Sequence, residues 1–245
     1  MSRTVKRCII ISVIALLIIA CNFLHKVLYV QINDEKYCIL SSEINIRGFI
    51  GGADIEKLSK FKRVKDLSVS SIESDISFVE KHPNLENLSL CIDDIKDFTP
   101  LNSCKNIKEF GITCNSIDGA VIANMNELQK LVLKIQHLTN GSQIWECSKL
   151  VAADITVPDE GLSLKGIGDL DKLNHLYLSG EGKVSDADEL CKCDSLTELG
   201  IVCEIDDISF LTDLPALEKL YIEKNMVDQN TISQLEDKSI EITLY

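Results

Sequence analysis

The sequence is poor in aromatic side chains and has no excess of positive charge. Phenylalanine, tryptophan and tyrosine make up 5% of its 245 residues, so aliphatic side chains have to form most of the core. Its 25 basic residues face 38 acidic ones, a formal net charge of −13. Without Arg3, Lys6 and Arg7 the balance is 22 basic to 38 acidic residues, or −16. A chain with no positive stripe does not displace counterions from nucleic acid, so we expect no nucleic-acid partner and repulsion from anionic lipid headgroups.

Sequence motifs of catalysis and metal binding are also missing. No G-x-S-x-G motif accompanies any histidine, and the glycines at 51–52 and 180–182 do not form a phosphate-binding loop. Cys191-x-Cys193 has no second cysteine pair for a metal. The acid pairs at 93–94 and 206–207 follow strands, where they either bind a cation weakly or cap a solvated turn, and the turn is favoured. We therefore predict a protein that is not an enzyme and has no cofactor and no metal.

The N-terminus carries a basic stretch followed by an apolar one. Cys8 to Leu24, "CIIISVIALLIIACNFL", is 17 residues without a charge. Residues 1–26 are predicted to be an uncleaved signal anchor, with the N-terminus in the cytoplasm, or a lipoprotein signal in which Cys21 is lipidated. A cleaved, secreted form is the third alternative. Each of them places the rest of the chain on the extracytoplasmic side.

An apolar-x-x-apolar-x-apolar triplet recurs along the chain at intervals of 21 to 23 residues. Degenerate copies occur at Ile44/Ile46 and at Ile240/Ile242. The alternation within each triplet predicts a short strand. Between triplets, apolar residues follow at every third position, as at Ile92, Ile95 and Phe98, which predicts a 3₁₀ or short helical return arm. The eight full copies begin at Val64, Leu85, Ile107, Leu128, Leu150, Leu173, Leu196 and Leu217.

The repeat resembles the leucine-rich repeat, whose motif is L-x-x-L-x-L-x-x-N/C-x-L. "LEKLYIEKNMV" (217–227) and "IKEFGITCNSI" (107–117) keep its asparagine, while Asp93 and Ile72 replace it in two other copies. The short repeats are similar to those of bacterial internalin-like surface proteins. This resemblance implies an α/β solenoid over residues 41–245, with a parallel concave β-sheet and about eight full repeats of ~22 residues. Neighbouring repeats stack and together bury the apolar face that a single repeat cannot bury alone.

The two ends of a solenoid need covering. Residues 27–40 have two apolar runs around Asn33-Asp34-Glu35-Lys36, which predicts a hairpin that caps the first repeat. The chain stops on a predicted strand, "SIEITLY", which lacks a cap. An open edge of this kind can be covered by a partner or by a second copy, so self-association through the C-terminal strand is a further expectation.

Cysteines fall at fixed positions of the repeat. Cys104, Cys147 and Cys193 occupy the position three residues before a triplet, a column that also holds Phe61 and His82. They are two repeats apart, roughly 10 Å at the strand spacing of a sheet, which is too far for a disulfide. We predict buried free thiols that act as small apolar side chains.

Function is expected on the outward side chains of the strands. The residue between the second and third apolar positions points away from the core, and in the C-terminal half this row contains Asp154, Tyr177 and Tyr221. Tyrosine is enriched at binding centres, although β-propensity alone also explains it. We predict a membrane-tethered, non-catalytic module that binds an unidentified protein partner. The alternative is a structural component of an envelope complex, joined through the uncapped C-terminal strand. The predicted contact residues are Tyr177, Tyr221, His175, Asp154, Lys134 and Thr156.

Overall fold

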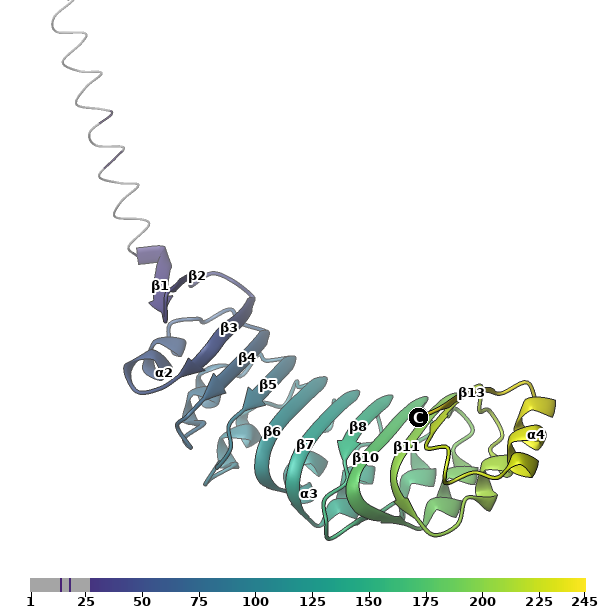
Figure 1. Ribbon diagram of the computed structural model, residues 1–245. Coiled ribbons are helices and arrows are strands. Elements are labelled where there is room, and N and C mark those ends of the chain that lie inside the picture. The colour runs from purple at the N-terminus through teal and green to yellow at the C-terminus, as the bar shows by residue number, and fades with distance from the viewer. Residues whose placement is uncertain (1–13, 15–17, 19–26) are drawn as a thin grey trace, which may run out of the picture.

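Each apolar triplet forms one strand of a single parallel sheet. The computed structural model describes residues 27–245 together with residues 14 and 18, and its ribbon is a curved solenoid (Figure 1). The sheet has 11 strands; ten are ordered β13-β12-β11-β10-β8-β7-β6-β5-β4-β3, and β9 pairs with β10. The strands are β3 (Glu43–Ile50), β4 (Asp66–Ser71), β5 (Asn87–Cys91), β6 (Glu109–Asp118), β7 (Lys130–Thr139), β8 (Ala152–Thr156), β9 (Leu162–Ser163), β10 (His175–Ser185), β11 (Glu198–Ile205), β12 (Lys219–Ile222) and β13 (Glu241–Leu244).

The register aligns equivalent positions of successive repeats. Leu176 of β10 pairs with Leu199 of β11, which pairs with Leu220 of β12. All three side chains are fully buried. Burying a leucine contributes about 2 kcal/mol, and each anchor is covered mainly by its equivalents in the adjacent repeats. The predicted solenoid with a parallel sheet is confirmed.

The return arms are short, as the three-residue spacing predicted. Six are 3₁₀ helices, and α2 and α3 serve the first repeat and the β6–β7 connection. Asp207 accepts hydrogen bonds from the backbone N–H (2.8 Å) and hydroxyl (2.9 Å) of Ser209, and Asp97 binds Thr99 in the same way. Asp207 therefore has the turn-capping role that was favoured for the acid pairs, whereas Asp94 forms an ion pair with Lys96 and Asp206 forms one with Lys183. The arms are α2 (Ala53–Leu58), η1 (Ser77–Lys81), η2 (Thr99–Ser103), α3 (Gly119–Ala123), η3 (Gly141–Glu146), η4 (Ile167–Asp169), η5 (Ala187–Lys192) and η6 (Ser209–Asp213).

The asparagine position of the repeat motif does not form a buried ladder. Asn115 and Asn225 are both exposed. In β6 the alternation of the strand continues past the triplet, so Cys114 points into the core and Asn115 points out. Ile92 and Ile135 fill the position of Cys114 in the neighbouring repeats. Apolar side chains thus replace the asparagine ladder of the motif.

A hairpin and a helix accompany the two ends of the sheet. β1 (Tyr29–Ile32) and β2 (Glu35–Cys38) pair antiparallel next to the first repeat. The side-chain amide of Asn33 donates to the carbonyl of Arg47 (3.0 Å), which ties the hairpin to β3. At the other end, α4 (Gln229–Asp237) precedes β13 (Figure 1). β13 pairs only with β12, and 39% of Leu244 is exposed.

The eight cysteines within residues 27–245 are all free. The Cys147 thiol donates to the carbonyl of Ile122 (3.4 Å), and the Cys193 thiol donates to that of Ile167 (3.5 Å). Burial raises the pKa of both thiols to about 11, so neither forms a thiolate near neutral pH. The prediction of buried free thiols in this column is confirmed.

The predicted signal segment falls almost entirely outside the described residues. Of residues 1–26, the structure describes only 14 and 18, and Cys21 is not among them. Within the described part of the chain, no helix combines the length and the apolar character needed to span a bilayer.

His82 is the polar member of the column that holds the buried cysteines. Only 3% of the residue is exposed, and neither ring nitrogen has a hydrogen-bond partner within the described chain. Burial lowers the pKa of His82 below its ordinary value of 6.5, and the nearby charge of Lys62 acts in the same direction. The folded protein therefore holds this ring neutral.

We expect His82 to make the fold sensitive to acid. Because the unfolded chain binds the proton more tightly, the free energy of unfolding is unaffected above pH 6.5 and falls as the pH drops from there towards the lower folded-state pKa. His82→Leu should remove part of this loss and stabilise the protein by about 1 kcal/mol near neutral pH, since it removes unsatisfied buried nitrogens. Urea titrations at several pH values measure both effects. The exposed-histidine control His137→Gln should keep the acid loss; an unchanged pH profile in His82→Leu contradicts the prediction.

Candidate functional site

The concave face, which is the side of the sheet turned away from the return arms, carries parallel rows of outward side chains. Strand register places equivalent residues side by side. The middle row is the one predicted from the sequence, and it contains Asn45, Ser68, Ser89, Gly111, Val132, Asp154, Tyr177, Gly200, Tyr221 and Thr243. A second row, here called the charged row, contains Glu43, Asp66, Asn87, Glu109, Lys130, Ala152, His175, Glu198, Lys219 and Glu241.

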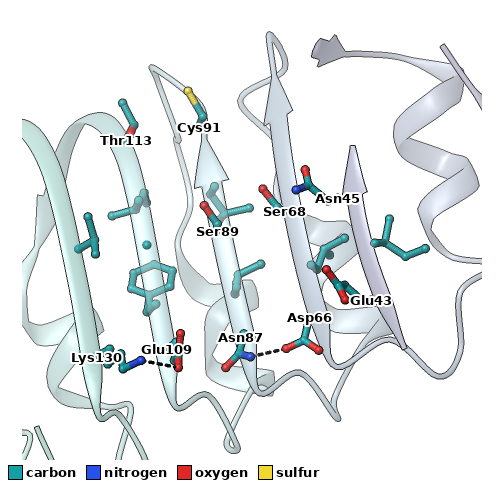
Figure 2. Close-up of a pocket in the computed structure, with 18 of the residues that line it drawn as sticks. Glu43, Asn45, Asp66, Ser68, Asn87, Ser89, Cys91, Glu109, Thr113 and Lys130 are labelled. Atoms are coloured by element: carbon teal, nitrogen blue, oxygen red, sulfur yellow. Dashed lines mark hydrogen bonds and ion pairs between the residues drawn. The ribbon is translucent and has the colours of Figure 1, made fainter. Parts of the chain in front are cut away.

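The N-terminal half of this face is hollowed. A cavity of about 440 Å³, here called the concave hollow, extends across β3 to β7 (Figure 2). Its floor lies low because the centre of the middle row there consists of the small residues Ser68, Ser89 and Gly111, with Asn45 and Val132 at the two ends. Cys91 and Thr113 line it from the next row. The run of small side chains leaves space that a partner can fill.

The charged row borders the concave hollow along one side. Glu43 and Asp66 make its β3–β4 end acidic, and the Asn87 amide donates to Asp66 (Figure 2). Lys130 of β7 pairs with Glu109 of β6 at 3.2 Å. Lys134, one of the predicted contact residues, also lines the hollow from β7. The lining is thus acidic at its β3–β4 end, and at its β6–β7 end it carries Lys134 beside the Lys130–Glu109 pair.

In the C-terminal half, the protein's own tyrosines cover the sheet. The ring of Tyr177 lies across Gly200 so closely that a Cβ on this glycine would come within 2.0 Å of the ring. Gly200 is therefore buried although it belongs to an outward row. Burial and a hydrogen bond with Tyr245, the last residue of the chain, raise the pKa of Tyr177. A hydrogen bond to Glu198 raises the pKa of Tyr221.

His175 connects several of the predicted contact residues. Its Nε2 lies 2.8 Å from Asp154 Oδ1 and its Nδ1 lies 3.4 Å from Glu198 Oε2. Glu198 also binds Tyr221, so a chain of polar contacts runs from β8 to β12. Both imidazole nitrogens are engaged by carboxylates, which gives the ring a role in ordering this surface. Within the described residues, no cluster of His, Cys, Asp or Glu has a geometry that would hold a metal ion.

The structure divides the predicted contact residues between two places. Asp154, His175 and Tyr221 belong to the network around Glu198. Tyr177 lies beside it over Gly200 and forms a hydrogen bond with Tyr245, whereas Lys134 lies in the concave hollow. Thr156 is half-buried on β8 beside Ser179, in neither group. Of the charged row, sequence reasoning found only His175 and missed Glu198 and the other charged members. Strand alternation contains this signal, since the charged row lies two residues before the middle row on every strand.

The contact between Tyr177 and Gly200 yields a test of this arrangement. Gly200→Ala places a methyl group where the ring lies, so we expect Tyr177 to turn away and its pKa to fall back towards 10. A tyrosine side chain moves easily, and the loss of stability should stay below about 1 kcal/mol. Ultraviolet titration of the phenols, with Tyr177→Phe to assign the signal, measures the change. Gly111→Ala is the matched control, because its Cβ would meet no atom closer than Ser89 Oγ at 3.5 Å. An unshifted titration in Gly200→Ala contradicts the packing described here.

No protein-family model and no curated protein matches the sequence. Internalin C2 of Listeria monocytogenes is similar in structure, with a TM-score of 0.50 and 20% identity over 78% of this chain and 84% of that chain. An internalin, InlF, of the same organism has a TM-score of 0.45 and 19% identity over 78% and 72% of the two chains. A leucine-rich repeat protein of Leptospira interrogans has a TM-score of 0.39 and 16% identity over 76% and 62%. Together with the parallel sheet and the 3₁₀ return arms, the likeness to internalin C2 identifies the fold of this chain as an internalin-like leucine-rich repeat solenoid.

Proposed function

We propose that the chain is a non-catalytic protein-binding module that presents its concave face to a partner. The observation that carries this proposal is the concave hollow of about 440 Å³ beside a face otherwise covered by tyrosines. Binding energy at protein interfaces concentrates where a side chain of one partner fills a pocket of the other. The concave hollow offers such a pocket, and the tyrosines add contact area with polar tips.

The charges around the concave hollow suggest the orientation of the partner. Glu43 and Asp66 favour a basic group at the β3–β4 end, and Lys130 and Lys134 favour an acidic group at β7. Between them, the lining of serine, glycine and threonine accepts an apolar or aromatic side chain. A segment that carries a basic residue, a bulky residue and an acidic residue in this order complements the surface.

We further propose that residues 1–26 tether this module to the extracytoplasmic side of a membrane. Support comes from the sequence, in which a basic stretch precedes 17 residues without a charge. An uncleaved anchor and a lipidated Cys21 give the same location with different attachments. Either one holds the concave face close to the membrane surface, where it meets partners that are confined there.

The alternative function is assembly through the end of the sheet. The specific observation in its favour is that β13 pairs on one side only and leaves Leu244 partly exposed. An unpaired edge is a template for another strand. In this case residues 239–245 are needed for association, and substitutions in the concave hollow have no effect.

Filling the concave hollow should abolish partner capture. Ser89→Trp places a large ring among small residues, so we expect at least a tenfold loss of affinity, about 1.4 kcal/mol, without loss of the fold. Crosslinking on intact cells followed by co-purification measures the capture. Asn102→Trp in η2 adds the same ring to the opposite face and should leave binding intact.

Two further variants separate the proposals. Tyr177→Ala/Tyr221→Ala should weaken capture if the tyrosines contribute contact area. Removal of residues 239–245 should prevent association only if assembly uses the edge of β13. If capture survives Ser89→Trp but is lost when residues 239–245 are removed, the concave-face proposal is wrong and assembly through β13 replaces it.

The N-terminal mass of the membrane-bound protein decides how it is tethered. We expect the protein to sediment with membranes and to keep Met1, as an uncleaved anchor does. A chain that begins at a lipidated Cys21, and that loses membrane attachment in Cys21→Ser, retains the tether but makes the protein a lipoprotein. A soluble chain that begins beyond residue 26 is incompatible with a tether of either kind.

A further inference from the structure

A second hollow lies at the edge of the sheet, away from the concave hollow. It has a volume of about 410 Å³ and is formed by the loops that precede β4, β5 and β6. It shares no lining residue with the concave hollow. We call it the basic hollow, and its lining consists of Lys62, Arg63, Lys65, Asn84, Glu86 and Asn106.

The charge of the basic hollow is opposite in sign to the net charge of the chain. The segment 57–65, "KLSKFKRVK", contains five basic residues and no acidic one, in a protein of net charge −13. Lys57 pairs with Asp54, and Lys65 pairs with Glu86. Lys62 and Arg63 are exposed and have no acidic side chain within 4.0 Å in the described structure. Two cations of the hollow are therefore not neutralised.

The one acid in the basic hollow is already occupied. Glu86 binds Lys65 on one side and Lys108 on the other, the latter at 2.7 Å. These two lysines lower the pKa of Glu86 to about 2, so it remains a carboxylate that positions both ammonium groups. Asn84 and Asn106 add amide donors to the lining. The hollow thus presents positive charge and several hydrogen-bond donors to one space.

We propose that the basic hollow binds a phosphate group. A guanidinium binds two oxygens of a phosphate at once, and an ammonium group adds a point charge. A phosphate has more acceptor oxygens and more charge than a carboxylate, so it uses the arginine, the lysines and the amides together. The positive charge does not continue along the edge, because the equivalent loops of later repeats carry Glu127, Asp171 and Asp194 beside Lys149 and Lys172, and Lys149 is paired with Glu127. The ligand is therefore expected to be compact. A long polyanion that follows this edge would meet these acids.

A phosphate site at this edge departs from the sequence-based expectation of repulsion from anionic lipid headgroups. That expectation rested on the net charge, which is a sum over the whole chain and does not show that basic residues lie together at one edge. The free phosphate of a small anion and the phosphate of a lipid headgroup have the chemistry that the basic hollow recognises. The experiment has to distinguish these two sources.

Tripolyphosphate is a suitable compact probe. We expect calorimetry on the full chain, in non-ionic detergent at low ionic strength, to detect its binding and to show weakening by salt. Lys62→Gln/Arg63→Gln should reduce the affinity at least tenfold. Lys172→Gln/Lys192→Gln removes the same charge from later repeats, at the loop before β10 and at the end of η5, and should change the affinity less than twofold. Thermal unfolding verifies that both variants fold.

Competition identifies the source of the phosphate. With the full chain in phosphatidylcholine vesicles, addition of phosphatidylglycerol lowers the apparent affinity for tripolyphosphate if headgroups occupy the basic hollow. An unchanged affinity assigns the hollow to soluble phosphates. Both results support the site, provided that Lys62→Gln/Arg63→Gln removes the binding. Equal affinities of the wild type and this variant, or an equal loss in the control variant, overturn the proposal.

Discussion

The structure depends on one constraint: no repeat of this chain buries its own apolar triplet. Leu176, Leu199 and Leu220 are shielded because the parallel register stacks them on one another. A repeat that lost this register would expose its anchors, at a cost of about 2 kcal/mol for each leucine. Because alternate residues of a strand face opposite sides, the register that buries the anchors also places every outward side chain in a row. The concave surface that we propose for binding is therefore a consequence of core packing.

The rows explain why one half of the concave face is hollow and the other is covered. Where consecutive repeats carry small residues, as at Ser89 and Gly111, the sheet itself forms the floor of a cavity. Where a large residue precedes a glycine, the large side chain lies across the gap, as Tyr177 does over Gly200. The same fold thus provides a recess and a tyrosine platform. The two lie apart on the concave face because the small residues belong to early repeats and the tyrosines belong to later ones.

Sequence reasoning predicted the strands, the return arms and the buried cysteine column, because each depends on local alternation and on a constant repeat length. It also placed the outward row that contains Asp154 and Tyr177. It did not predict that Tyr177 would reach Tyr245, since that contact spans three strands and depends on the direction of a side chain. The concave hollow was missed for a similar reason, because its volume depends on the sizes of side chains from several adjacent rows and strands.

The local charge of a surface also depends on the fold and cannot be inferred from the net charge of the chain. The net charge of −13 describes no particular face, because Lys62, Arg63 and Lys65 gather in the loop before β4, while the loops of later repeats carry acids together with Lys149 and Lys172. The basic hollow borders β4, β5 and β6, the strands that also carry the concave hollow. One surface lies on the face of these strands and the other at their beginning, so a partner on the first does not compete for the residues of the second. The geometry of a single sheet therefore leaves both hollows accessible at the same time.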